Sequence, residues 1–282
     1  MALRQVKFTE PYTAIAADFS ARGIRTDAPG FYDDPAFVAV EQRQTDYLNN
    51  YAKFVQDRPY DDAYLARASR EIPEVVALLH QELVADGRLG ACVDISITLT
   101  KALNREGFWN YQTKGGLTID FPRTSGIGTR YFWPFDRGNF TTGHSWIVAP
   151  PFLVIDLSIK LQPHKSGKDY LPDYVLATEA KAVKASVVDV ASPEARADYR
   201  ARGIPELKLL ARQLPHIAPF WRVFSPREIL HDDVKLKYVA TGVGVPATAE
   251  DQLGDWQCNG RRAGELYAEI IQPRLRTLRG AQ

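Results

Sequence analysis

The chain has 282 residues, of which 45% are apolar and 11% aromatic, enough to bury a large core. Its 35 Lys and Arg residues nearly cancel its 34 Asp and Glu residues, so no basic patch predicts a nucleic-acid partner. No apolar run reaches the roughly 18–20 residues of a membrane span. Residues 1–20 also lack the apolar segment of a secretory signal. We therefore expect a cytoplasmic protein with no membrane partner. A secreted effector without a cleaved signal peptide is the alternative.

The first third of the chain predicts mostly helix. Residues 1–33 carry several Pro and Gly residues and are expected to be irregular. Apolar residues recur at helical spacing over 35–57 and over 62–86. We expect one helix in each range, with a break or kink in the second at Pro73 and its end at Gly87.

The middle of the chain predicts a switch to strands. Residues 90–106 fit both a strand period and a helical period, and periodicity alone does not decide between them. Residues 107–121 and 129–135 are expected to be extended. Residues 144–161 predict two short strands around the turn at 149–151.

The remainder predicts a mixture of helices and strands. Helices are expected over 193–202 and 206–214, and a strand over 234–240. A last helix is expected over 264–279, interrupted at Pro273.

Cys92 has the surroundings of a nucleophilic cysteine. The thiolate is the reactive form of cysteine, and it needs a nearby imidazole together with a third group that orients that imidazole. Small residues precede Cys92, so the backbone there can approach a substrate closely. If a helix starts at this point, its dipole favours the thiolate.

His144 and Asp156 could supply the other two groups. If 144–148 and 152–156 pair as an antiparallel hairpin around the 149–151 loop, Val148 faces Phe152 and His144 lies directly opposite Asp156. The carboxylate can then accept the imidazole N–H and leave the other ring nitrogen for the thiol. A one-residue slip in register would separate the two side chains.

These motifs identify a resemblance. The run Gly90-x-Cys92-x-Asp94, the run His144-Ser145-Trp146 and an apolar strand ending in Asp156 together resemble the transglutaminase-like (papain-like) superfamily of cysteine enzymes. The resemblance covers about 75–160. It implies an α+β fold in which Cys92 opens a helix over 91–105, packed on an antiparallel sheet that carries His144 and Asp156.

The resemblance implies a catalytic triad of Cys92, His144 and Asp156. The Cys92 backbone N–H would stabilise an oxyanion together with one unidentified donor. Trp146 and Asp94 are candidate substrate-binding residues, although core packing for Trp146 and a structural hydrogen bond for Asp94 remain open alternatives.

The remaining Cys and His residues predict no second site. Cys258 is expected to be structural, and a single disulfide with Cys92 is the most that two cysteines allow. The other four histidines lack partners at metal-ligand spacing, so we expect no metal and no other cofactor.

We therefore expect one domain over 1–282, with a helical N-terminal region (1–74), the transglutaminase-like core (75–165) and a mixed C-terminal extension (166–282). The expected activity is thiol-dependent acyl transfer on a protein or peptide substrate, most simply hydrolysis of a peptide or amide bond. Transfer of the acyl group to an amine acceptor is one alternative. A non-catalytic binding scaffold that retains the triad is another. The oligomeric state stays open.

Overall fold

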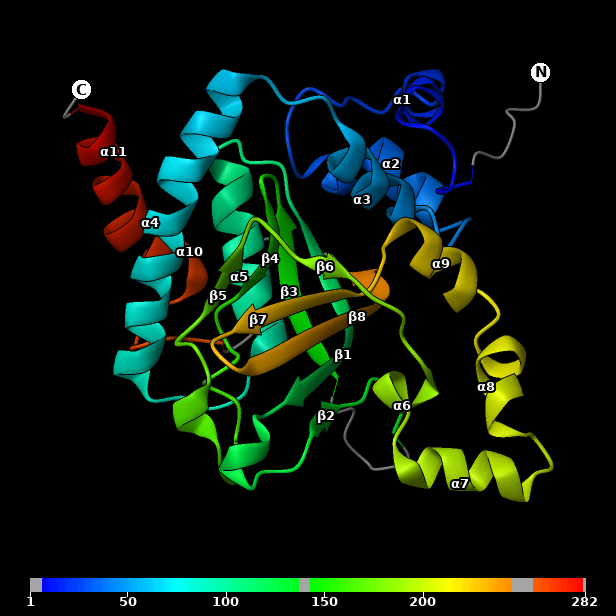
Figure 1. Ribbon diagram of the computed structural model, residues 1–282. Coiled ribbons are helices and arrows are strands. Elements are labelled where there is room, and N and C mark those ends of the chain that lie inside the picture. Colours follow the sequence, from blue (N-terminus) through cyan, green and yellow to red (C-terminus); the bar gives the residue numbers. More distant parts are fainter. Residues whose placement is uncertain (1–6, 137–142, 245–255, 281–282) are drawn as a thin grey trace.

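One antiparallel sheet organises the molecule (Figure 1). The computed structural model describes residues 7–136, 143–244 and 256–280, and eight strands occur within them. Their order along the sheet is β5-β4-β3-β1-β8-β7-β6, with β2 also pairing with β1. The strands are β1 (Tyr111–Asp120), β2 (Arg130–Phe132), β3 (His144–Ala149), β4 (Phe152–Asp156), β5 (Val175–Ala177), β6 (Lys181–Ala182), β7 (Arg227–His231) and β8 (Val234–Gly244).

The longest pairing joins β1 to β8, from Gln112 opposite Gly244 to Asp120 opposite Lys235. The register shifts between Lys114 and Gly115. At Gly115 a Cβ atom would lie only 2.1 Å from a backbone oxygen of β8, so this close approach requires glycine. The segment predicted as a C-terminal extension therefore supplies a central strand of the same sheet that carries His144 and Asp156.

The sheet curls into a half-barrel. Two strands, β3 and β1, separate β4 from β8 along the sheet. The Tyr238 hydroxyl of β8 nevertheless donates a hydrogen bond of 2.9 Å to Asp156 of β4. This contact is possible only because the sheet bends enough to bring non-adjacent strands together on its concave face.

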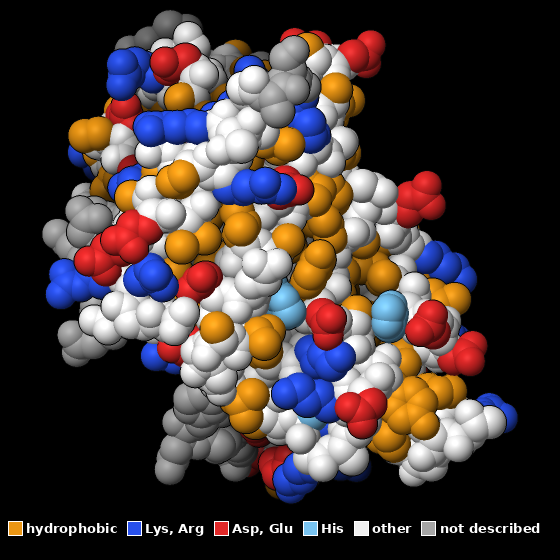
Figure 2. Space-filling view, turned by 90° about the vertical axis from the view of Figure 1, so that its left-hand side faces the viewer, with side chains coloured by type: hydrophobic (Ala, Val, Ile, Leu, Met, Phe, Trp, Pro, Cys, Tyr) orange, Lys and Arg blue, Asp and Glu red, His pale blue; other side chains and the backbone are white. Residues whose placement is uncertain are grey.

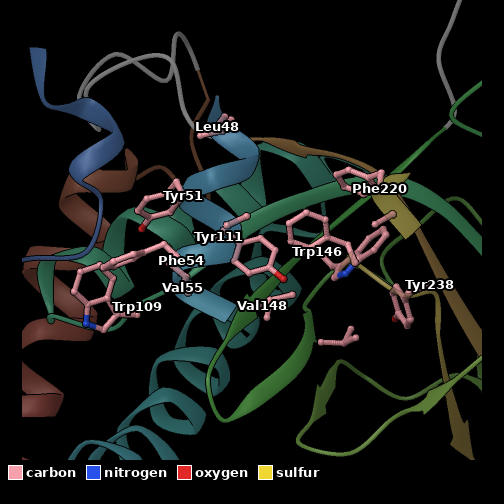
Figure 3. Packing of buried hydrophobic residues seen from close by; sticks show 14 of the residues in the cluster. Leu48, Tyr51, Phe54, Val55, Trp109, Tyr111, Trp146, Val148, Phe220 and Tyr238 are labelled. Atoms are coloured by element: carbon pink, nitrogen blue, oxygen red, sulfur yellow. The ribbon is translucent and has the colours of Figure 1, made fainter. Parts of the chain in front are cut away.

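Helices cover both faces of the half-barrel. The N-terminal helices α1–α3 and α9 share a core with one face, whereas α4, α5 and the C-terminal helices share a core with the other. Figure 3 shows aromatic side chains of the first core converging from α3, β1, β3, α9 and β8.

The α-helices are α1 (Tyr12–Ala21), α2 (Pro35–Glu41), α3 (Leu48–Asp57), α4 (Asp62–Asp86), α5 (Cys92–Arg105), α6 (Val187–Val190), α7 (Pro193–Ala201), α8 (Glu206–Gln213), α9 (Ile217–Val223), α10 (Ala263–Leu266) and α11 (Gln272–Gly280).

Short 3-10 helices cover Phe31–Asp33, Arg123–Ser125 and Lys168–Tyr170, and a π-helix over Tyr267–Ile271 joins α10 to α11. In the described ranges no helix is long and apolar enough to cross a membrane. On the face shown in Figure 2, cationic and acidic side chains are interspersed.

The structure corrects the predictions for the N-terminal region. Residues 1–33 were expected to be irregular, but α1 forms directly after Pro11, and its Ile15 and Phe19 are fully buried. Proline favours the position before a helix as readily as a loop, and burial of apolar residues decided between the two. The helix predicted over 35–57 is two helices, α2 and α3, separated by a turn.

Two prolines, Pro73 and Pro273, do not interrupt the helices in which an interruption was predicted. The helix α4 runs continuously through Pro73, so the predicted break is wrong, and it ends at Gly87, which adopts the left-handed conformation. The C-terminal helical stretch is not interrupted at Pro273, because the wider π-helix turn lies directly before α11. The predicted helices over 91–105, 193–202 and 206–214 correspond to α5, α7 and α8. The extended prediction for 129–135 is correct only over the three residues of β2.

Candidate active site

Cys92 is the first residue of α5 and follows an unusual backbone turn. Gly90 and Ala91 both have positive φ angles, of 83° and 57°. The Gly90 N–H donates to the Leu161 carbonyl over 2.8 Å, which ties this turn to the segment after β4. A helix leaves the N–H groups of its first turn without partners inside the helix. The Cys92 thiol therefore lies at the positive end of a 14-residue helix, beside free backbone donors.

A buried polar network holds the first turn of α5 against the sheet. The Gln112 side-chain amide on β1 donates to the Ser145 hydroxyl of β3 over 2.8 Å and to the Val93 carbonyl over 3.4 Å. The Ser145 hydroxyl donates in turn to the Thr113 carbonyl over 3.2 Å. This network fixes where Cys92 sits relative to His144, the residue before Ser145.

The β3–β4 hairpin brings His144 and Asp156 together, but not in the predicted register. Ala149 pairs with Phe152 across a two-residue Pro-Pro turn, and Ile147 pairs with Ile155. The expected pairing of Val148 with Phe152 is wrong, because the turn contains two residues and not three, and a bulge in β4 beyond the Ala149–Phe152 pair adds a second residue to the difference. The register beyond the bulge differs by two residues from the prediction. His144 and Asp156 are therefore diagonal neighbours rather than direct opposites, and they still share one face.

His144 and Asp156 form a short, fully buried contact. His144 Nε2 donates to Asp156 Oδ2 over 2.6 Å, and both side chains are 0% exposed. The other carboxylate oxygen accepts from the Ser158 N–H over 2.9 Å and from the Ser158 hydroxyl over 3.0 Å. Tyr238 completes the shell through its bond to Oδ2. Burial raises the pKa of Asp156, but His144, Ser158 and Tyr238 outweigh it and hold that pKa below the ordinary value.

The surroundings of His144 favour its protonated form. Burial lowers its pKa, but Asp156 and a smaller contribution from Cys92 outweigh burial and raise the pKa well above the ordinary value. Because Nε2 is bonded to Asp156, Nδ1 is the nitrogen left for the thiol. Nδ1 is buried and makes no hydrogen bond of ordinary geometry to the described residues. The Cys92 side chain is nonetheless close enough to act on the ring.

The sequence did not point to Tyr238 or Ser158. Ser158 is only two residues beyond Asp156, so a carboxylate at a strand end followed by serine was an available local signal. Tyr238 lies 82 residues after Asp156 in the sequence, and it reaches Asp156 only because the sheet curls.

The two candidate substrate-binding residues occupy different surroundings. Trp146 is 3% exposed and packs edge-on against Tyr238, with ring centroids 5.1 Å apart, so it belongs to the buried aromatic core (Figure 3). Asp94 is half-buried in the first turn of α5 and forms no hydrogen bond with the described part of the chain. Burial raises the pKa of Asp94, and the distant Arg88 only partly opposes it. The structural hydrogen bond considered for Asp94 is therefore absent among the described residues.

Cys258 lies far from His144 in the sequence and is fully enclosed by the core. It is 0% exposed, and its pKa is raised to about 11 by burial and by Asp86 and Glu82. Both cysteines are free thiols, so no disulfide joins them. Among residues 7–136, 143–244 and 256–280, no three His, Cys, Asp or Glu side chains converge as a metal site requires.

Two hollows lie near the triad. One is a narrow space lined by Trp146 and Tyr238 among others, and Cys92, His144 and Asp156 do not line it. The other is open and is lined by β2 and the loop around His164. Cys92 is 9% exposed, and two residues near it in the sequence, Leu89 and Val93, expose apolar side chains.

Comparison of this chain with protein-family models, with curated proteins and with solved structures finds no match. The chemistry must therefore be argued from the geometry. A thiol at a helix N-terminus, an imidazole with one free nitrogen and a buried carboxylate on the other nitrogen are the parts that nucleophilic catalysis requires.

Proposed function

We propose that this protein is a thiol-dependent acyl-transfer enzyme with a papain-like, transglutaminase-like core, and that Cys92, His144 and Asp156 are its catalytic residues. The observation that carries the proposal is the buried His144, which Asp156 holds through Nε2 while Nδ1 remains for Cys92. An ordinary core histidine would bond both ring nitrogens or expose one of them.

The reaction follows from these roles. In the resting pair the proton of the Cys92 thiol lies on His144 Nδ1, as the raised pKa of His144 favours, and the thiolate sulfur attacks the substrate carbonyl carbon. The backbone N–H groups at the start of α5 stabilise the resulting oxyanion. The carbon–nitrogen bond then breaks, and the leaving amine takes the proton from His144. The thioester that remains is attacked by an acceptor, which His144 deprotonates, and the thiol is regenerated. Asp156 keeps the imidazole oriented throughout.

Water is the default acceptor, because it is always present, and the reaction is then hydrolysis of a peptide or amide bond. An amine acceptor would give a new amide bond instead. Both outcomes share the thioester, so the thioester is the species to test.

An activated ester tests the proposal without knowledge of the natural substrate. We expect p-nitrophenyl acetate to acetylate Cys92 and not Cys258, with the adduct located by peptide mass spectrometry and removed by hydroxylamine. The Cys92→Ala and His144→Ala proteins should lose the adduct. Release of acetate or of an acetylated amine, with putrescine added, then identifies the acceptor. Acetylation of Cys92 that does not depend on His144 would contradict the proposal and favour a binding scaffold.

A further inference from the structure

An open, cationic hollow lies near His144, with the Phe132 ring as the contact between them. It is the hollow lined by Arg130, Tyr131, Phe132, Pro163, His164 and Lys165. The Phe132 ring lies between two imidazoles, with centroids 5.7 Å from His144 and 5.9 Å from His164. The hollow is therefore one aromatic ring away from the His144 imidazole.

The loop on one wall of this hollow is also bonded to the turn that precedes Cys92. The loop that carries Pro163 and His164 includes Leu161, whose carbonyl accepts from the Gly90 N–H over 2.8 Å. Gly90 precedes Cys92 by two residues. This hydrogen bond connects the start of α5 to the loop that forms one wall of the hollow, although Cys92 and His144 do not themselves line the hollow.

Arg130 is oriented in this hollow by neutral groups. Its Nη1 donates to His164 Nδ1 over 3.2 Å, and its Nη2 donates to the Ser166 hydroxyl over 2.7 Å. His164 Nε2 donates to the Ile159 carbonyl over 2.7 Å, so the ring is neutral and its Nδ1 is the acceptor. Burial and the nearby cations Arg130, Lys168 and His144 keep the pKa of His164 below its ordinary value.

The charge of Arg130 is consequently not neutralised. Within the described ranges it forms no ion pair with a carboxylate, and neither does Lys165, the second cation on the wall. A guanidinium held rigidly by two neutral acceptors keeps its full charge and has N–H donors to spare. Such a group is suited to a planar anion, which it can bind through two parallel hydrogen bonds.

We propose that the hollow formed by Arg130, His164 and Lys165 is a substrate subsite that binds a carboxylate group next to the bond that Cys92 attacks. The inference rests on the proposed function and specifies its substrate class: acyl donors with a carboxylate close to the scissile bond. Arg130 binds the carboxylate, and His164 positions Arg130.

Binding is tested first without any reaction, in the Cys92→Ala protein. Sodium propionate is titrated while the ring C–H signals of His164, assigned with a His164→Gln protein, are followed by NMR. We expect saturable shifts with propionate and none with propionamide. Arg130→Gln should remove the response, Arg130→Lys should weaken it, and Lys181→Gln, which removes an exposed cation from the far edge strand β6, should leave it unchanged. A response that survives Arg130→Gln, or tighter binding of inorganic phosphate than of propionate, would overturn the proposal.

The location beside the thiol is tested by alkylation of the Cys92 protein. N-bromoacetyl derivatives of glycine and β-alanine are compared with their uncharged amides. We expect a carboxylate to accelerate alkylation with at least one spacer, and Arg130→Gln to reduce that advantage about tenfold, the loss of one charge-assisted pair. The amide reagents alone report activation of the thiol. If they react with Cys92 and the carboxylates gain nothing, the subsite fails although the proposed function stands. If no reagent reacts, the proposed function fails, and the titration still tests carboxylate binding in the hollow.

Discussion

Asp156 accepts four hydrogen bonds while completely buried, and this saturation gives the candidate triad its rigidity. A buried carboxylate is stable only when its oxygens are paired. Three of the four donors come from outside the triad, two from Ser158 and one from Tyr238. The side chain that orients His144 is thus itself held by residues that have no direct part in the proposed chemistry.

Loss of the Tyr238 hydroxyl should weaken both stability and thiol reactivity. Tyr238→Phe removes one donor to a charged acceptor, and we expect unfolding to become easier by about 1–2 kcal/mol. Alkylation of Cys92 near pH 7 should slow several-fold, because Asp156 orients His144 less firmly. Urea denaturation and alkylation rates measure the two effects.

Tyr51→Phe is the matched control for Tyr238→Phe. Tyr51 is equally buried, and its hydroxyl donates to the Asn110 carbonyl, in the core around α3. The Tyr51→Phe protein should lose comparable stability, and its rate of Cys92 alkylation should stay unchanged. An equal effect of both variants on alkylation would mean that Tyr238 acts only through general stability.

The pKa values of the buried pair predict how stability depends on pH. His144 has a raised pKa, so its contribution is complete below its ordinary value of 6.5 and is lost as the pH rises through the raised value. Asp156 has a lowered pKa, so its contribution is complete above 3.8 and is lost as the pH falls through the lowered value. The pair therefore stabilises most between these two ordinary values.

Asp156→Asn should accordingly cost the most stability near pH 6, on the order of 3 kcal/mol. The difference from the unchanged protein should narrow as the pH rises toward 10. Asp189→Asn is the comparison, because Asp189 is also buried but pairs with Lys237 over 2.9 Å and not with a histidine. Its loss of stability should stay constant from pH 6 to 9. Denaturant unfolding of both variants across this pH range measures these losses of stability. A pH-independent loss of stability in Asp156→Asn would contradict the pKa shifts assigned to His144 and Asp156.

At the scale of elements, the turn before α5 places the thiol. Gly90→Ala should cost about 1 kcal/mol, because nothing within 4 Å obstructs the added Cβ and only the left-handed backbone opposes it. We also expect slower alkylation of Cys92, since the turn that positions it must distort. Gly87→Ala is matched, with φ of 69° and equally open surroundings. It should lose similar stability without affecting the thiol, and equal alkylation rates in both variants would contradict the role of the turn.

The elements show what local sequence could and could not predict. The helix that begins at Cys92 and the hairpin around Pro150-Pro151 were predicted, because a family motif or a strong alternation marks them. The bulge in β4 was not predicted, since no glycine or proline signals it. Two predictions that relied on proline differ from the structure: Pro11 directly precedes a helix, and α4 continues through Pro73. At these points tertiary burial, which a local window cannot see, outweighed the local signal.

At the scale of the whole molecule, the site depends on a strand far along the chain. The contact between His144 and Asp156 could be anticipated because both residues lie in one hairpin, whereas the contact of Tyr238 with Asp156 could not, because pairing of β1 with β8 is set by global topology. Strand β7 and helix α9 were also missed, and both pack around this late part of the sheet.

A fragment covering the predicted core, 75–165, should therefore not fold by itself. It retains α5, β1, β3 and β4 but loses β8, the longest partner of β1, and begins inside α4. We expect poor dispersion in its NMR spectrum and no selective alkylation of Cys92. The full chain under the same conditions is the reference. A well-dispersed spectrum from the fragment would show that β8 is dispensable for the site.

The central claim is that Cys92 and His144 form an activated pair, and the pH dependence of iodoacetamide alkylation tests it most directly. Peptide mass spectrometry follows Cys92 in the unchanged and His144→Ala proteins, with the buried Cys258 as internal reference. We predict that Cys92 reacts readily down to about pH 6, well below the range of a free thiol, and that His144→Ala abolishes this reactivity while Cys258 stays inert. A Cys92 that reacts only at alkaline pH, equally in both proteins, would contradict the account.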